Sequence, residues 1–399
     1  MNEPFLSAVP IIKKLEDAGF EAYFVGGSVR DYLLGKQISD VDIATSAVPD
    51  EVKTIFTKTV DIGIEHGTVL VLYHGNSYEI TTFRTEGEYQ DYRRPKEVAF
   101  IRSLTEDLKR RDFTMNAIAM DRNGRVIDPF NGQLAIKNKL IETVGPAHDR
   151  FHEDALRMMR AVRFASQLSF QIEPETLKAL SILNHLLANI AVERKRAEFE
   201  KLLMGENRKN ALSLLLETNL HLFLPGLGKH TKKIADMLGF SCEHLGRIEM
   251  WCLLLYCLEV YEVDTEAFLR EWRLPLKDIK AIKDRLYFTR QRLVQEWSTH
   301  QLYMAGYDTI QSVEKLTFVI NGSQGKNTVQ HWLKLYEKLP IKSRTDLDVT
   351  GSDVIEWSGR RGGPWLKQTL LQIEKAVLEG EVVNEKPKIK EWLKTCSQN

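Results

Sequence analysis

Two carboxylates spaced two residues apart follow a glycine pair near the start of the chain. The segment Phe24-Val-Gly-Gly-Ser-Val-Arg-Asp is followed nine residues later by Asp40-Val-Asp-Ile-Ala-Thr. On a β-strand, residues i and i+2 point to the same face, with their Cα atoms roughly 6.5–7 Å apart. Two carboxylates on one face suit a site for two Mg²⁺ ions about 3.5–4 Å apart. We therefore predict that Asp40 and Asp42 are catalytic and hold Mg²⁺.

The glycine pair predicts a phosphate-binding turn. A strand that runs into Gly26 and Gly27 and then into a helix lets backbone N–H groups approach phosphate oxygens. The helix N-terminus adds the positive end of its dipole, and Arg30 adds a charged donor. Alone, a glycine pair is more often a simple turn, and a single strand aspartate is more often a solvated strand end. The two patterns together favour the functional interpretation.

Two further segments offer groups of the same chemistry. Glu79, in Tyr78-Glu-Ile-Thr-Thr-Phe, is a candidate third carboxylate or a base for an attacking hydroxyl. An exposed strand glutamate explains it equally well. The segment Arg110-Arg-Asp-Phe-Thr-Met-Asn-Ala supplies a basic pair for phosphates, and Asp112 is a candidate ligand for a ribose. Without the first motif this segment would be a weak signal, because such charge clusters are usually solvated.

The elements that must position these residues change in type along the chain. Short β-branched or aromatic runs bounded by Gly, Asp or Asn predict strands at 22–25, 41–45, 68–73, 77–83 and 117–120. Helices are expected between them at 6–18 and 50–55. From about residue 151, apolar residues recur at three- and four-residue spacing, which predicts helices at 153–168, 194–204, 248–258 and 365–380. We predict an α+β protein, with a small mixed sheet and helices at its start and helices after it.

Composition limits the class of protein. With 399 residues, two or more domains are expected. The 43% apolar and 28% charged content is that of an ordinary soluble protein, and the formal net charge of zero argues against a wholly basic nucleic-acid binder. The four cysteines have no metal-ligand spacing, which favours a reducing cytoplasm. We expect no signal peptide and no membrane span, because no window holds about 20 apolar residues.

The order of these motifs resembles the class II tRNA nucleotidyltransferase and poly(A) polymerase family. The resemblance rests on Gly-Gly-Ser-Val-Arg-Asp, Asp40-x-Asp42, Arg-Arg-Asp-Phe-Thr-Met-Asn-Ala, Glu153-Asp-Ala-Leu-Arg-Met-Met-Arg and Glu193-Arg-Lys-Arg-Ala-Glu-Phe-Glu. The chain length and the tail Gly-Arg-Arg-Gly-Gly-Pro-Trp resemble the bacillus-type CCA-adding members. The resemblance implies a catalytic head at 1–145, a helical neck at 146–210, a helical body at 211–335 and a tRNA-binding tail at 336–399.

The resemblance also implies how a base is chosen. Asp154 and Arg157 would imitate a template base, because cytosine and adenine both present an amino donor beside a ring-nitrogen acceptor. Uracil and guanine would turn a carbonyl toward the carboxylate. An ordinary i, i+3 salt bridge is the commoner meaning of this pair. The resemblance assigns nucleotide binding to Arg111, Arg160 and Arg163 too, although about 100° per residue turns Arg163 away from Asp154.

The implied reaction is the addition of C, C and A to the 3′ end of tRNA from CTP and ATP, with Mg²⁺ and release of pyrophosphate. Arg360 and Arg361, before the helix start at Pro364, are candidate tRNA contacts, although a plain loop is nearly as consistent. The charged run from Glu193 is either a solvated face or, by resemblance, a scaffold for the neck. The sequence does not decide whether the chain forms a homodimer.

The alternatives are relatives with a narrower product. These are a CC-adding enzyme, an A-adding enzyme and a poly(A) polymerase. CC-adding relatives lack part of a loop that is intact here at 85–95, which favours full CCA addition. A non-catalytic tRNA-binding protein would be indicated by loss of either strand carboxylate, and both are present.

Overall fold

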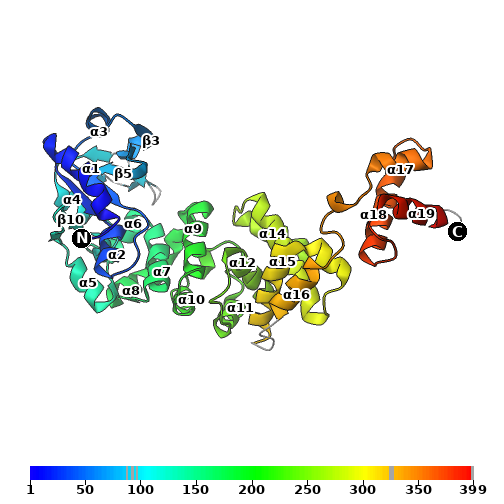
Figure 1. Cartoon of the computed structure of the whole chain (residues 1–399). Helices are drawn as coiled ribbons and strands as arrows, with labels where there is room; N and C mark the ends of the chain where they lie inside the picture. The colour runs from blue at the N-terminus through cyan, green and yellow to red at the C-terminus, as the bar shows by residue number, and fades with distance from the viewer. Residues whose placement is uncertain (87–88, 91–93, 96–97, 323–327, 397–399) are drawn as a thin grey trace. The chain divides into compact units, whose positions relative to one another are not determined.

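The computed structural model describes residues 1–86, 89–90, 94–95, 98–322 and 328–396, and the chain divides into two compact units. The first unit contains residues 1–238 and 271–273, and the second contains residues 239–270 and 274–399. All strands found in the described residues belong to the first unit (Figure 1). The second unit is helical, which confirms the predicted α+β class.

A seven-stranded sheet forms the centre of the N-terminal part of the first unit. Its neighbours pair antiparallel, except β2 and β5, which pair parallel. The strand order is β11-β10-β1-β2-β5-β4-β3. The strands are β1 (Ala22–Val25), β2 (Asp42–Thr45), β3 (Thr59–Gly63), β4 (Thr68–Tyr73), β5 (Asn76–Thr82), β10 (Ala119–Met120) and β11 (Val126–Ile127).

Shorter strands pair outside this sheet. They are β6 (Arg84–Glu86) with β9 (Val98–Phe100), β7 (Tyr89–Gln90) with β8 (Arg94–Pro95), and β12 (Leu140–Ile141) with β13 (Gln171–Ile172).

Helix α1 (Phe5–Asp17) covers part of the sheet because its apolar residues recur on one face. Ile11, Ile12 and Leu15 are fully buried. The rings of Phe5 and Phe24 lie 4.7 Å apart between α1 and β1. This packing fixes β1, and β1 leads directly into the glycine turn.

The first unit continues through a series of helices. Helix α7 is almost wholly buried and packs against α9, so it forms the axis of the region after the sheet. The helices are α2 (Gly27–Leu33), α3 (Pro49–Ile55), α4 (Leu104–Lys109), α5 (Gly132–Asn138), α6 (Ala147–Glu153), α7 (Leu156–Leu168), α8 (Pro174–Leu183), α9 (Val192–Leu203), α10 (Arg208–Glu217) and α11 (Thr231–Asp236), with short 3₁₀ turns that include η2 (Thr114–Asn116).

The second unit is built from longer helices around its own core. Trp297, Ile310, Trp332 and Ile373 belong to one cluster of buried side chains there. The helices are α12 (Arg247–Cys257), α13 (Glu262–Glu271), α14 (Leu276–Val294), α15 (Thr299–Ile320), α16 (Thr328–Glu337), α17 (Gly351–Ser358), α18 (Pro364–Leu378) and α19 (Lys386–Cys396).

The structure corrects two local predictions. Strand β2 begins at Asp42, so Asp40 precedes the strand instead of belonging to it. The single helix predicted over 153–168 is wrong, because α6 ends at Glu153 and α7 begins at Leu156. Asp154 has an extended backbone (φ −136°, ψ 103°), and its Oδ1 accepts the backbone N–H of Leu156 at 3.0 Å. This local hydrogen bond competes with helix continuation, as aspartate side chains commonly do.

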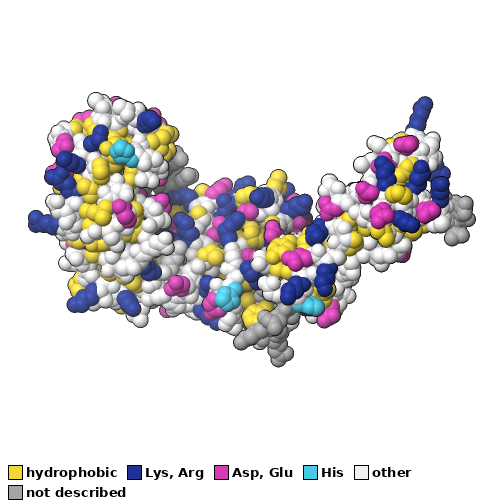
Figure 2. Space-filling model, viewed as in Figure 1, with side chains coloured by type: hydrophobic (Ala, Val, Ile, Leu, Met, Phe, Trp, Pro, Cys, Tyr) yellow, Lys and Arg dark blue, Asp and Glu magenta, His cyan; other side chains and the backbone are white. Residues whose placement is uncertain are grey.

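Among the described residues, none of the helices combines the length and apolar character that crossing a bilayer requires. On the face shown in Figure 2, basic and acidic side chains are intermingled over the surface of both units, in keeping with the zero net charge. Part of the 85–95 segment, which favoured full CCA addition, lies outside the described residues.

Candidate active site

The parallel pairing of β2 and β5 brings two of the predicted carboxylates together. Asp42, the first residue of β2, is the register partner of Glu79 on β5. Asp40 precedes β2, yet it lines the same cleft as Asp42 and Glu79. All three side chains are exposed at this cleft. Asp40 and Asp42 therefore line one cleft, but the predicted strand geometry does not apply to the pair, because only Asp42 belongs to the strand.

The cleft has a volume of about 330 Å³ and a mainly polar lining. Besides the carboxylates, its wall is formed by Gly27, Ser28, Asp31, Ile38, Ser39, Val41, Leu70 and Ser77. Ser28 donates its hydroxyl to the Val25 carbonyl at 3.0 Å, which closes the turn between β1 and α2. The glycine turn therefore forms one wall of the carboxylate cleft.

Glycine is required at position 26 for two reasons. Its φ of +72° lies in the region that side chains rarely adopt. A Cβ there would also lie 2.8 Å from Nη1 of Arg111 and 4.0 Å from a carboxylate oxygen of Asp42. The turn thus brings backbone, a guanidinium and a metal-ligand candidate together, an arrangement suited to an anionic ligand.

The electrostatics of the cleft also fit a cation bound beside a phosphate. Partial burial raises the pKa of the Asp42 carboxyl, Arg111 opposes this rise, and the nearby charges of Glu79 and Asp40 add to it. A carboxylate whose pKa is raised by neighbouring negative charge is one that a bound cation would stabilise in its ionised form. Within the described residues, no three or more His, Cys, Asp or Glu side chains are arranged to hold a metal ion by themselves. Mg²⁺ commonly takes one or two carboxylates, with water and substrate phosphates as its other ligands, so this donor set fits it.

Arg30 lies outside the lining of the cleft. Its Nη1 donates to Asn116 Oδ1 at 2.7 Å, its Nε donates to Asp31 at 2.9 Å, and its guanidinium lies 5.1 Å from the centre of the Phe164 ring. Arg30 is buried, and in this structure it joins α2 to η2 and α7. It therefore supports the glycine turn from behind.

Asp112 is the centre of a buried polar cluster. Arg160 Nε donates to its Oδ2 at 2.7 Å, and the Asn116 amide donates to its Oδ1 at 3.0 Å. Burial by itself would raise the pKa of Asp112, but Arg160 and Asn116 outweigh burial and hold it at about 2. Two of the predicted nucleotide-binding residues, Asp112 and Arg160, thus bind each other.

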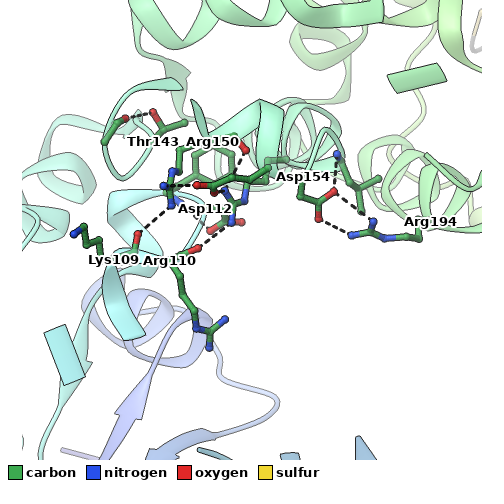
Figure 3. Close-up of polar contacts among 12 residues, drawn as sticks. Lys109, Arg110, Asp112, Thr143, Arg150, Asp154 and Arg194 are labelled. Carbon is green, nitrogen blue, oxygen red and sulfur yellow. Dashed lines mark hydrogen bonds and ion pairs between the residues drawn. The ribbon is translucent and has the colours of Figure 1, made fainter. Parts of the chain in front are cut away.

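Asp154 and Arg157 do not form the ordinary i, i+3 salt bridge. Asp154 accepts from Arg194 on α9, with nitrogen–oxygen distances of 3.3 and 2.6 Å (Figure 3). Arg157 donates to Glu153 at 2.5 Å, to the Arg150 carbonyl at 3.1 Å and to the Arg110 carbonyl at 2.9 Å. The helix break at Asp154 gives the two side chains different partners.

The charged run of α9 is only partly solvated, because Lys195 and Glu198 are buried while Glu193 is exposed. Glu198 forms an ion pair with Arg163 at 2.5 Å, and Lys195 donates to two carbonyls, of Leu187 and Phe223. Burial lowers the pKa of Arg163 to about 10 against the charge of Glu198, so this side chain stays cationic at neutral pH. Arg163 therefore joins α7 to α9.

Sequence reasoning missed Asp107 and Arg194. Asp107 is buried and binds both Arg110 and Arg111. Its position near the end of a charged segment, three and four residues before two arginines, was an available signal. Arg194 had only the weaker signal of an alternating charged run, because its partner lies 40 residues away.

In the second unit, α18 begins at Pro364 as predicted. Arg360 and Arg361 precede it and are exposed. The Trp365 indole donates to the Arg361 carbonyl at 2.9 Å, and the Arg360 guanidinium lies 6.0 Å from the Trp365 ring centre. The indole thus fixes the turn that presents two cations to solvent.

Comparisons with known proteins match this organisation. Residues 22–142 match the family model of the poly A polymerase head domain, residues 169–230 match "Probable RNA and SrmB- binding site of polymerase A", and residues 246–393 match tRNA nucleotidyltransferase domain 2. The residues that form the glycine turn, the carboxylate cleft and most of the sheet thus lie within the part of the chain that matches a head domain of the poly A polymerase type.

Relatives that match over their full length show which nucleotidyltransferase family the chain resembles. A CCA-adding enzyme of Listeria monocytogenes is 50% identical over 395 residues, which cover 98% of this chain and 99% of that protein. One of Geobacillus stearothermophilus is 49% identical over 397 residues, which cover 98% and 97%. The crystal structure of the Bacillus stearothermophilus CCA-adding enzyme in complex with CTP superposes with a TM-score of 0.92 at 46% identity, covering 100% of this chain and 98% of that one. The chain belongs to the CCA-adding enzyme family of tRNA nucleotidyltransferases.

Proposed function

We propose that this chain adds C, C and A to the 3′ end of tRNA from CTP and ATP at the cleft between β2 and β5. One observation carries the assignment: Asp42 pairs with Glu79, and both line a cleft with Asp40 and the glycine turn. The cleft therefore places residues that can bind a metal ion beside residues that can bind phosphate. Relatives about 50% identical over their full length, named CCA-adding enzymes, support the choice of substrates.

Asp40 and Asp42 would hold Mg²⁺, with Glu79 as a third carboxylate or as the base. When bound, Mg²⁺ would activate the tRNA 3′-hydroxyl and neutralise charge on the triphosphate. The 3′-oxygen forms a bond to the α-phosphorus, the bond from the α-phosphorus to the bridging oxygen breaks, and pyrophosphate leaves. The hydroxyl proton passes to a cleft carboxylate or to water.

The chain's own donors would orient the triphosphate. Arg111 is the cation best placed for this, because its Nη1 adjoins Gly26 at the cleft. Gly27 lines the cleft and lets phosphate oxygens approach the backbone. We assign Arg30 to the support of the glycine turn, and Asp112, Arg160 and Arg163 to the packing of α7, because each of them binds other residues of the first unit.

Base selection would belong to Asp154 and Arg157. A carboxylate accepts from the amino group of cytosine or adenine, and a guanidinium donates to the neighbouring ring nitrogen. Uracil and guanine place a carbonyl oxygen against the carboxylate, which leaves two acceptors facing each other. One pocket therefore accepts both bases of the CCA end and disfavours the other two.

We assign the two cations before α18, Arg360 and Arg361, to the tRNA backbone, and we place the reaction in the cytoplasm, where a chain with sparse cysteines keeps them reduced. The division into head, neck, body and tail keeps its predicted boundaries in this proposal. The head would carry the chemistry, the neck the base selection, and the tail the tRNA contacts.

A transfer assay tests the function directly. The protein is incubated with tRNA transcripts that lack CCA, CA or only A, and with each of the four nucleotides and Mg²⁺ in turn. We expect CMP to be added to the first two substrates and AMP to the third. Three other outcomes would contradict full CCA addition. Addition that stops after CC would indicate a CC-adding enzyme, addition of A alone an A-adding enzyme, and extended A tracts a poly(A) polymerase.

A further inference from the structure

One buried carboxylate ties together the two arginines at the end of α4. The Asp107 side chain is 1% exposed. It accepts from Arg110 Nε at 2.9 Å and Nη2 at 2.8 Å, from Arg111 Nη2 at 3.2 Å, and from the Arg84 backbone N–H at 3.3 Å. Burial alone would raise the pKa of Asp107, but the charges of Arg110 and Arg111 outweigh it and lower the pKa, so the group is anionic at neutral pH.

The two arginines contact different parts of the proposed active site: one the catalytic cleft, the other the residues proposed to select the base. Arg111 lies beside Asp42 of the catalytic cleft, because a Cβ at Gly26 would be 2.8 Å from its Nη1 and 4.0 Å from an Asp42 oxygen, and its charge opposes the rise in the pKa of Asp42. Arg110 reaches the base-selecting residues, because its backbone carbonyl accepts Nη2 of Arg157 at 2.9 Å. Figure 3 shows Arg110 beside the polar cluster that contains Asp112.

The geometry points to Asp107 as a positioning residue that links triphosphate binding to base selection. This inference rests on the proposed function. Asp107 holds Arg111 at the cleft, and through the side chain of Arg110 it fixes the carbonyl that holds Arg157. A shift of the segment 110–111 therefore moves the phosphate contact and the base contact together.

The test compares Asp107→Asn with wild type in kcat/KM and KM for all four nucleotides on tRNA that lacks its terminal residues. Asparagine keeps the shape, but it removes the charge and turns an amide donor toward the arginines. We expect the KM for CTP to rise about tenfold and the preference for CTP over UTP to fall by a similar factor. In an Arg111→Ala background, Asp107→Asn should raise the KM for CTP little further, because the contact through which it acts is already lost.

Two variants separate positioning from general stability. Glu51→Gln is the matched control, because Glu51 on α3 binds Arg102 at 3.1 Å in the same unit, away from the residues that line the cleft. It should lower the melting temperature slightly and leave KM and nucleotide preference unchanged. If Asp107→Asn does not fold, Asp107→Glu, which keeps the charge and moves it by one methylene, should show the same two kinetic changes in smaller degree.

A variant of Asp107 that lowers only the melting temperature, with KM and nucleotide preference unchanged, would overturn the inference. A full further rise in KM in the Arg111→Ala background would overturn it as well. Failure of the proposed function is a different result, because wild-type protein would then transfer neither CMP nor AMP.

Discussion

Replacing Asp154 by alanine should change which nucleotides the protein accepts. The two carboxylate oxygens already accept three N–H groups among the described residues, two from Arg194 and one from the Leu156 backbone. A carboxylate has about four acceptor positions, so about one stays available for the amino group of a base. Asp154→Ala removes that acceptor and also the repulsion that a carbonyl of uracil or guanine would meet.

The magnitude follows from the size of one contact with a base edge. Such a contact is worth about 1–3 kcal/mol of discrimination, which corresponds to a loss of about 5-fold to 150-fold in the preference for CTP and ATP over UTP and GTP. The stability cost should be smaller. The Asp154–Arg194 pair is partly solvated, with side chains 17% and 30% exposed, and pairs of this kind contribute about 1 kcal/mol or less.

The assay is kcat/KM for the four nucleotides on tRNA lacking its terminal residues, and Arg194→Ala is the matched control. Arg194→Ala breaks the same ion pair and leaves the carboxylate in place, so it should slow transfer and keep most of the preference. If Asp154→Ala and Arg194→Ala lowered all four values in the same proportion, the pair would be a structural salt bridge. Base selection would then depend on other residues.

Three further outcomes are expected. Asp40→Ala or Asp42→Ala should abolish transfer of both CMP and AMP while tRNA binding, measured by gel shift, stays near wild type; near-normal transfer of either nucleotide would contradict a shared site. Replacing Arg360 and Arg361 by Ala should raise the KM for tRNA and reduce the salt slope by about two, with the KM for CTP unchanged; an unchanged KM for tRNA would exclude them from the binding surface. Because the folded pKa of Asp112, about 2, lies below its ordinary 3.8, its carboxylate stabilises the fold by about 2 kcal/mol above pH 4, and this contribution is lost as the pH falls toward 2. Asp112→Asn should lower the free energy of unfolding at pH 7 by about that amount and weaken its decrease between pH 4 and pH 2. If the free energy of unfolding kept the same dependence on pH, the charge of Asp112 would contribute nothing.

Several strands and the glycine turn were predictable because their signals are local. Strands 22–25 and 68–73 have the predicted bounds, since β-branched and aromatic runs between turn residues need little tertiary context. The edge strand β3, at 59–63, was not predicted. Three of its five residues are exposed, so it lacks the alternation that reveals a half-buried strand.

The sequence by itself determined that the residues of the first motif lie together. A strand, a glycine pair, a helix and two carboxylates follow one another within about 20 residues, and backbone geometry over such a distance places them at one cleft. The same reasoning located the start of α18, where proline is compatible with the first turn of a helix.

Only the tertiary structure decided which groups bind each other. The partner of Asp154 is Arg194, 40 residues away, and the partner of Arg30 is Asn116, 86 residues away. Helical spacing suggested Arg157 for Asp154, but the break in the helix gives each a different partner. Whether a charge is solvated, bound to a neighbour or held for a ligand depends on which elements pack around it, and that depends on contacts between residues far apart in the sequence.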